Sequence, residues 1–61
     1  MTSGRSDIID VELDLLHETD LAFLLSDGGD IEEWMPKSMV EDNGDGTFAM
    51  PEWLALKRGF I

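Results

Sequence analysis

Acidic and amide side chains near the middle of the chain have the spacing of a calcium-binding loop. Oxygen-bearing side chains stand at Glu41, Asn43, Asp45 and Glu52, and Gly46 occupies the turn position. An EF-hand loop uses oxygen ligands at these offsets, with a glycine for the sharp turn and a bidentate glutamate at the end. The four oxygen-bearing residues are therefore a candidate calcium site.

Three features of the sequence weaken the calcium interpretation. The first position is Glu41, where an EF-hand usually has the shorter Asp. Pro36 interrupts any long helix before the loop, and Pro51 immediately precedes Glu52. The alternative is a hairpin loop whose glycines supply positive φ angles. We favour the hairpin loop and expect no metal or other cofactor.

His17 is the second candidate for chemistry, because it lies among the carboxylates Asp14, Glu18 and Asp20. A histidine beside carboxylates can act as a base or a metal ligand. A catalytic pair also needs a nucleophile, and the chain has no Cys, no Tyr and few serines. We therefore expect His17 to be an ordinary turn residue and the protein not to be an enzyme.

The net charge excludes several classes of partner. The chain has 61 residues, with 14 acidic and 4 basic side chains and a formal net charge of −10. Phosphates of DNA or RNA and anionic membrane surfaces would repel such a protein. The longest unbroken apolar run covers only residues 21–25, which is too short to span a membrane. A chain of this length fits one small domain, and we expect it in the cytoplasm.

The charge is concentrated in one part of the chain. Residues 7–45 hold 13 of the acids and only one basic residue, Lys37, whereas the segments on either side each carry a charge of +1. Regularly spaced anions cost stability through self-repulsion, and solubility alone needs less net charge. The sequence leaves open whether this acidic segment serves a partner or only solubility.

A strict alternation predicts the first strand, from Ile9 to Leu15. Apolar residues at the odd positions alternate with Asp10, Glu12 and Asp14, which is typical of a strand with one buried face. The three acids would then project from one face at intervals of roughly 6.7 Å, twice the rise per residue. This spacing is similar to that of phosphates along a nucleic-acid strand. Residues 17–20 are predicted to form a turn.

The middle of the chain predicts a hairpin followed by a short strand. Residues 21–25 suit a central strand covered on both faces, and residues 26–30 are a dense turn signal. Residues 31–35 form the second strand, which Pro36 ends. Residues 37–40 are expected to form one helical turn, residues 41–46 a loop and residues 47–50 a strand.

A helix is predicted to begin at Pro51 and to end at Gly59, with Phe60 packing back on it. The expected fold class is α+β, with a small twisted antiparallel sheet of three to four strands, partly open and barrel-like, and one C-terminal helix. Residues 7–61 would form this single domain, and residues 1–6 are expected to be disordered. The residues expected in the core are Leu24, Trp34, Trp53 and Leu56.

Two segments of the chain resemble a group of small acidic proteins encoded by bacteriophages and prophages. Residues 33–38 read Glu-Trp-Met-Pro-Lys-Ser, and residues 51–59 contain the pattern P-E-W-L-A-x-K-x-G. In that group a W-x-P-K-S strand end leads through a D-G turn to such a helix. The likeness covers roughly residues 17–61 and departs at Met35, where the group has a branched residue. Some small acidic phage proteins of this size are anti-CRISPR inhibitors, and several of those resemble DNA in their charge.

Charge and resemblance together suggest an acidic DNA mimic that blocks the basic DNA-binding surface of a bacterial defence complex. The resemblance implies an anti-CRISPR protein acting on a type I Cascade effector in the host cytoplasm, and we expect a monomer. The alternative is a non-inhibitory phage accessory module that binds another basic protein. The candidate partner-binding residues are Asp10, Glu12 and Asp14 on the first strand, and Asp27, Asp30, Glu32 and Glu33 around the hairpin.

Overall fold

The alternating segment after residue 7 forms two strands, not the single strand predicted. In the computed structural model, which describes residues 7–61, β1 (Ile8–Glu12) pairs antiparallel with β6 (Thr47–Pro51). The next strand, β2 (Asp14–Glu18), pairs antiparallel with β3 (Ala22–Ser26) in a different sheet. The disorder expected for residues 1–6 concerns positions outside the described residues.

Leu13 marks the point where the chain leaves one sheet for the other. β6 begins at Thr47, which lies opposite Glu12, so β1 has no further partner beyond Glu12. The Leu13 N–H donates to the Gly46 carbonyl at 3.2 Å, and the Leu13 side chain is buried. Burial therefore alternates along the chain up to Leu13, although β1 already ends at Glu12.

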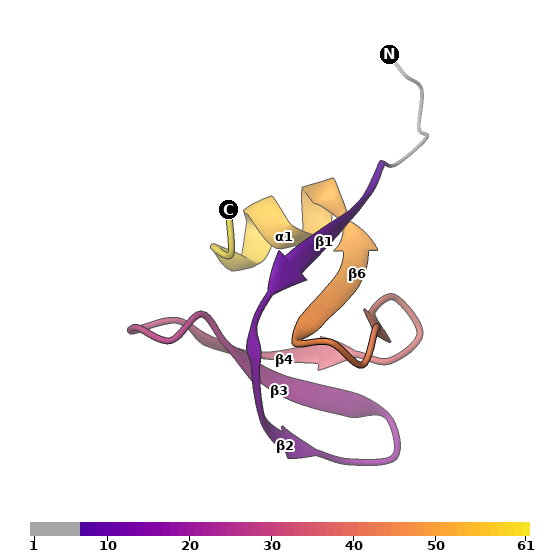
Figure 1. Cartoon of the computed structure of the whole chain (residues 1–61), viewed down its shortest axis with the longest axis vertical. Coiled ribbons are helices and arrows are strands. Elements are labelled where there is room, and N and C mark those ends of the chain that lie inside the picture. The colour runs from indigo at the N-terminus through magenta and orange to yellow at the C-terminus, as the bar shows by residue number, and fades with distance from the viewer. Residues whose placement is uncertain (1–6) are drawn as a thin grey trace.

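The fold contains two three-stranded antiparallel sheets and one helix. One sheet has the order β1-β6-β5, with β5 spanning Glu41–Asp42, and the other has the order β2-β3-β4, with β4 spanning Glu32–Pro36. Figure 1 shows α1, β1 and most of β6 above β4, β3 and β2. The predicted α+β class with a C-terminal helix is confirmed, but the strands form two sheets where one was expected.

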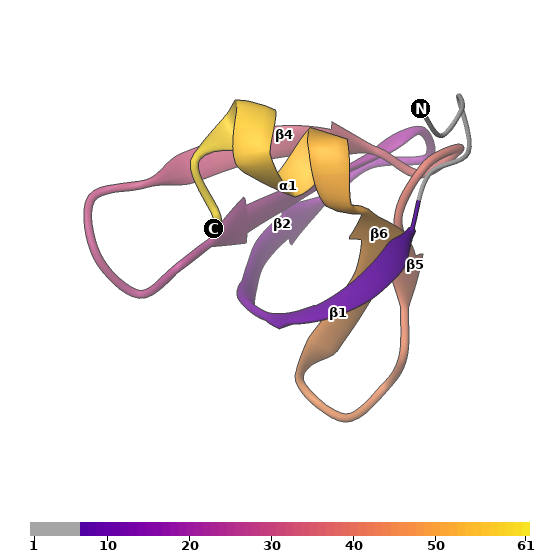
Figure 2. The ribbon, with the colours of Figure 1, turned by 90° about the horizontal axis from the view of Figure 1, so that it is seen from above.

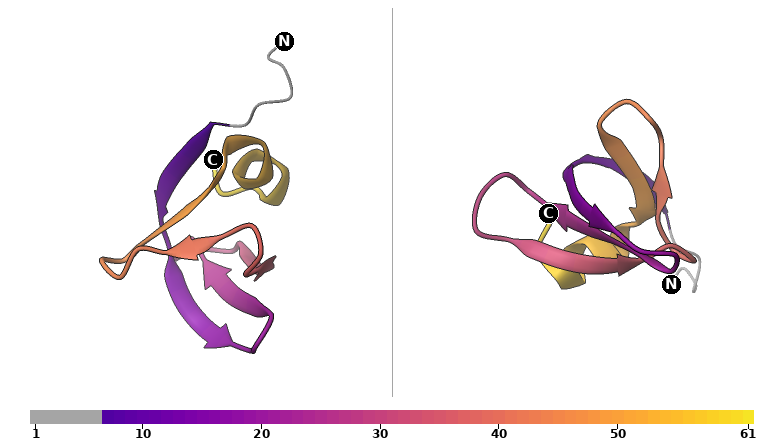
Figure 3. Two further views of the ribbon diagram at one scale, coloured as in Figure 1. Left: turned by 90° about the vertical axis from the view of Figure 1, so that its right-hand side faces the viewer. Right: turned by 90° about the horizontal axis from the view of Figure 1, so that it is seen from below.

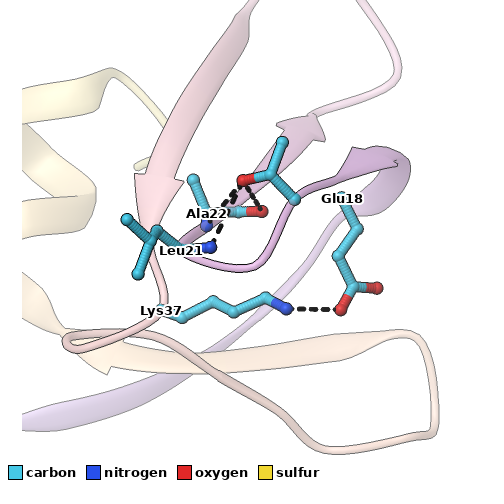
Figure 4. A network of polar contacts seen from close by, with 5 residues as sticks. Glu18, Leu21, Ala22 and Lys37 are labelled. Carbon is cyan, nitrogen blue, oxygen red and sulfur yellow. Dashed lines mark hydrogen bonds and ion pairs between the residues drawn. The ribbon is translucent and has the colours of Figure 1, made fainter.

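The β2–β3 connection is shorter than predicted. β2 continues to Glu18, so His17 lies in a strand and not in a turn. The Thr19 hydroxyl accepts the Leu21 and Ala22 N–H groups at 3.3 and 3.1 Å, which closes the reversal (Figure 4). A bulge at Leu16 shifts the register between the two strands. β3 is central in its sheet, as predicted, but it is not covered on both faces, since Ala22 and Leu24 are only partly buried. It begins one residue later than predicted, and Leu21, 80% exposed, lies in the turn.

The two hairpins that follow agree with the turn signals. β3 and β4 form the predicted hairpin and pair from Ser26↔Glu32 to Ala22↔Pro36. Both strands lie one residue later than predicted, and Pro36 is the last residue of β4. Residues 37–40 do not form a helical turn; the Met39 N–H donates to the Pro36 carbonyl at 3.0 Å in a single tight turn. β5 and β6 enclose a loop in which Gly44 and Gly46 have positive φ angles, as the hairpin interpretation of residues 41–46 requires.

The helix α1 (Glu52–Arg58) begins one residue later than predicted. Pro51 is the last residue of β6 and the N-cap of the helix, and it has no side-chain oxygen to cap the first turn. The Glu52 N–H instead donates to the Asp7 carbonyl at 2.8 Å. Gly59 ends the helix in the left-handed conformation, and the Phe60 N–H donates to the Ala55 carbonyl at 2.9 Å. The predicted C-terminal cap is confirmed.

The core lies between the two sheets and the helix. Figures 2 and 3 show α1 beside the end of β6, with β2 far from it in the left panel of Figure 3. Phe23 of one sheet and Phe48 of the other meet edge to face, with ring centroids 5.6 Å apart. The buried apolar residues are Val11, Leu13, Phe23, Leu25, Met35, Val40, Phe48, Met50, Leu54 and Ala55.

Three of the four residues expected in the core are exposed. Trp34, Trp53 and Leu56 are 47%, 45% and 58% exposed. Leu24 is half-buried. Trp34 alternates with Met35, and Met35 takes the inward position on β4. The helix turns Leu54 and Ala55 inward, so its neighbours Trp53 and Leu56 face solvent.

Two leucine substitutions test this assignment of the core. Leu25 is completely buried, and Leu25→Ala is expected to lower the free energy of unfolding by about 3 kcal/mol, or to unfold the chain. Leu56→Ala removes the same atoms from an exposed helix position and should change stability by no more than about 0.5 kcal/mol. Urea unfolding followed by circular dichroism measures both. Equal losses in the two variants would contradict the described core.

Candidate protein-binding surface

The outer face of the β1-β6-β5 sheet carries a group of exposed carboxylates. Asp10 lies opposite Ala49, which lies opposite Glu41, and Glu12 lies opposite Thr47. Residues paired directly across strands point to the same side of a sheet. Asp10, Glu12 and Glu41 are all exposed on this face. We call Asp10, Glu12, Glu41 and the adjacent Asp45 the acidic face.

Hydrogen bonds fix two of these carboxylates in place. The Asn43 side-chain amide donates to Asp10 Oδ1 at 3.0 Å and to Thr47 Oγ1 at 2.9 Å. The Thr47 hydroxyl and the Thr47 N–H both donate to Asp45 Oδ1, the latter at 3.0 Å. This chain of contacts joins β1 to the β5–β6 hairpin. It fixes the positions of the Asp10 carboxylate on β1 and the Asp45 carboxylate in the β5–β6 loop.

The same contacts change the acidity of Asp45. The hydrogen bond from the Thr47 hydroxyl, followed by that from the Thr47 N–H, lowers the pKa of Asp45 below the ordinary 3.8 of an aspartate. Asp45 is fully exposed, so this shift reflects the local donors and not burial. Its carboxylate therefore remains charged at any pH near neutrality.

Asp14 lies at the junction of the two sheets and belongs to β2, not to β1. It is the first residue of β2, directly after the buried Leu13. An open cleft of about 310 Å³ lies at this junction, and four carboxylates line it. They come from Glu12, Asp14, Asp27 and Asp45. Asp10, Glu12 and Asp14 thus do not form one continuous row on a single strand, but Asp14 shares the cleft with Asp27 and with Glu12.

The hairpin acids separate into three environments. Asp27 Oδ1 accepts the Gly29 N–H at 2.7 Å and the Ile31 N–H at 3.3 Å, so one of its oxygens shapes the loop. Asp30 and Glu32 are exposed. Glu33 is half-buried, and its carboxylate lies 3.4 Å from the Arg58 guanidinium at the end of α1. Glu33 therefore connects the helix to β4.

Few of the carboxylates have a cationic partner within residues 7–61. Lys37 forms an ion pair with Glu18, drawn in Figure 4, and lies 5.0 Å from the centre of the Phe23 ring. Arg58 pairs with Glu33. Neither of these two ion pairs involves the acidic face, and Lys57 of α1 forms no ion pair with it within residues 7–61, so its carboxylates keep their negative potential there.

The four candidate calcium ligands do not converge. Asn43 and Asp45 lie in the β5–β6 hairpin loop, whereas Glu52 begins α1 at the far end of β6. Five extended residues separate the loop from Glu52, which corresponds to roughly 17 Å. Asn43 and Asp45 are instead bonded to Asp10 and Thr47. In the described chain, no group of three or more His, Cys, Asp or Glu side chains is placed to hold a metal ion.

No protein-family model, curated protein or solved structure matches the chain. Within residues 7–61, no helix has the length and apolar character needed to cross a membrane.

Sequence reasoning missed two members of the acidic face. Glu41 and Asp45 drew attention only as calcium ligands, because the pairing of β5 with β6 and of β6 with β1 was not foreseen. The hairpin interpretation of residues 41–46 contained the necessary signal. The second strand of this hairpin begins at Thr47. When that strand also pairs with the first strand of the chain, Glu41 and Asp10 come to lie on the same face.

Replacing the Thr47 hydroxyl tests the network around Asp45. Thr47→Val removes the hydroxyl donor but keeps the N–H, so the pKa of Asp45 is expected to rise towards 3.8. A depressed native pKa stabilises the fold above the unfolded pKa, and that contribution is lost as the pH falls through the native pKa. An NMR titration of the Asp45 carboxyl carbon measures the shift.

Thr19→Val is the matched control, since Thr19 also uses its hydroxyl in a turn but lies in the other sheet. It should leave the Asp45 titration unchanged. An unaltered Asp45 pKa in Thr47→Val would show that the hydroxyl does not set it.

Proposed function

We propose that the protein is an inhibitor that binds the basic, nucleic-acid-binding surface of another protein and competes there with DNA. The observation that carries this proposal is the acidic face. Exposed carboxylates at Asp10, Glu12 and Glu41 share one side of a sheet, and Asp45 is held beside them by Thr47. Within the described residues, neither ion-paired cation neutralises them.

The physical basis is competition for cationic side chains. Proteins that bind DNA line their channels with Lys and Arg, which neutralise phosphates and release counterions. Carboxylates fixed on a sheet offer the same cations an alternative set of anions without the entropy of ordering a flexible chain. Long-range attraction would accelerate the encounter, and added salt would weaken it.

The resemblance to small acidic phage proteins narrows the proposed partner to a type I Cascade effector. Such effectors hold nucleic acid in positively charged channels and recognise the duplex by its backbone. An anti-CRISPR protein of this kind would act in the cytoplasm of the bacterial host. We propose that it acts as a monomer, because two chains with a formal charge of −10 repel each other.

Charge reversal on the acidic face tests the proposal. The double variant Asp10→Lys, Glu12→Lys should inhibit DNA binding by purified type I Cascade at least about tenfold less well than the wild type. Losing one close charge contact at an interface costs about 1.5 kcal/mol or more, which corresponds to about tenfold in affinity. The measurement is competition with labelled target DNA, repeated at several salt concentrations.

The control reverses the same amount of charge elsewhere. Asp7 and Asp20 are exposed and lie outside the acidic face, so Asp7→Lys, Asp20→Lys should stay within about threefold of the wild type. Circular dichroism confirms that both variants fold. Full inhibition by the Asp10/Glu12 variant, or inhibition that does not weaken with salt, would overturn the proposal. Binding to Cascade without displacement of DNA would favour the accessory-module alternative.

A further inference from the structure

The β2-β3-β4 sheet has an outer face that is apolar at its centre. Phe23, Leu25 and Met35 point from its inner face into the core. The alternation along each strand therefore turns Ala22 and Leu24 of β3, and Trp34 of β4, to the opposite side. Trp34 is 47% exposed there, and Leu24 is half-buried.

The strand register places these side chains in adjacent rows. Leu24 pairs with Trp34 on one side and with His17 on the other, and Ala22 pairs with Pro36 in the neighbouring row. The bulge at Leu16 makes two residues of β2 oppose Leu24. The centre of this outer face is thus a tryptophan and a leucine held side by side on rigid strands.

Carboxylates lie on the same face one row away. Asp14 pairs with Ser26, and Ser26 pairs with Glu32, so both acids flank β3 on the side of Leu24. Ser26 is two residues from Leu24, which puts the acidic row roughly 7 Å from the Trp34 row. Asp14 and Glu32 are exposed, whereas the serine between them is buried.

This arrangement restricts what can cover the face. A second copy of the chain would bring the Asp14 and Glu32 row against another strongly acidic surface. Nucleic acid would be repelled by the same carboxylates. A protein segment with apolar side chains flanked by Arg or Lys satisfies both rows, because the apolar groups pack on Trp34 and Leu24 while the cations meet the acids.

We propose that the outer face of the β2-β3-β4 sheet is a docking site for a protein segment in which apolar residues alternate with arginine or lysine, with Trp34 as its anchor. Tryptophan is enriched among residues that dominate interface energetics, and its ring also attracts guanidinium groups. This inference rests on the proposed function, since it assigns a second contact with the same basic partner. The acidic face supplies long-range attraction, and the Trp34 face supplies the contacts that hold the complex.

Trp34 can report its own environment once the other tryptophan is replaced. In Trp53→Phe, Trp34 is the only tryptophan, and its fluorescence is followed while a peptide of alternating Arg and Leu is added. The comparison peptide alternates Arg with Ser, which keeps the charge and removes the apolar groups. We expect a blue shift of Trp34 emission with the Arg-Leu peptide, and an affinity at least about tenfold higher than for the Arg-Ser peptide.

Trp34→Phe is the matched control, because its remaining Trp53 is exposed to a similar extent on α1. Trp53 emission should not shift. The double variant Asp14→Asn, Glu32→Asn in the Trp53→Phe background should weaken binding of both peptides. Circular dichroism verifies that each variant folds.

Three results would overturn the docking site. They are equal affinity for the two peptides, an equal response of Trp53, and a dimer in sedimentation experiments that Trp34→Ala dissociates. The last would identify a second copy as the occupant. The titration uses no Cascade, so this inference and the proposed function can fail separately.

Discussion

The fold depends on one constraint: a single extended segment must serve two sheets. Residues 8–18 pair first with β6 and then with β3, and the change occurs at Leu13. With Leu13 buried and its N–H bonded to Gly46, the two sheets are held across a shared core. The Phe23–Phe48 contact and the burial of Leu25, Met35 and Met50 all follow from this geometry. A single straight strand from Ile9 to Leu15 would pair with only one sheet and would leave the other without its third strand.

The ion pairs in the described part of the protein lie away from the acidic face. Two ion pairs, Lys37–Glu18 and Arg58–Glu33, connect separate elements, and the second fastens the end of α1 to β4. Both are partly exposed, and pairs of this kind contribute at most about 1 kcal/mol each. Within residues 7–61, neither of these two ion pairs involves a carboxylate on the outside of β1. The repulsion there is a cost to the fold that a basic partner would relieve.

Local signals in the sequence predicted the local structure well. Glycine and proline positions identified the β3–β4 hairpin, the loop before β6 and the end of α1, because φ preferences act within a few residues. Pairing between distant segments could not be predicted in this way. The division at Leu13 depends on where β6 begins. The exposure of Trp34 depends on whether Trp34 or its neighbour Met35 packs against the opposing sheet. For the same reason, the pattern that suggested calcium proved to contribute side chains to the outside of a sheet.

The bond between the Asp7 carbonyl and the Glu52 N–H joins the two ends of the domain, and it has a consequence for the order of folding. The β2-β3-β4 meander pairs neighbours in sequence and can form early. β1 precedes them in the chain, whereas its partner β6 and the helix α1 follow them. Contacts of such long sequence separation form slowly. A strand that has not yet paired can associate with other chains and aggregate, and charged residues reduce that tendency. β1 is an edge strand of its sheet, and the charges of Asp10 and Glu12 disfavour its pairing with another chain.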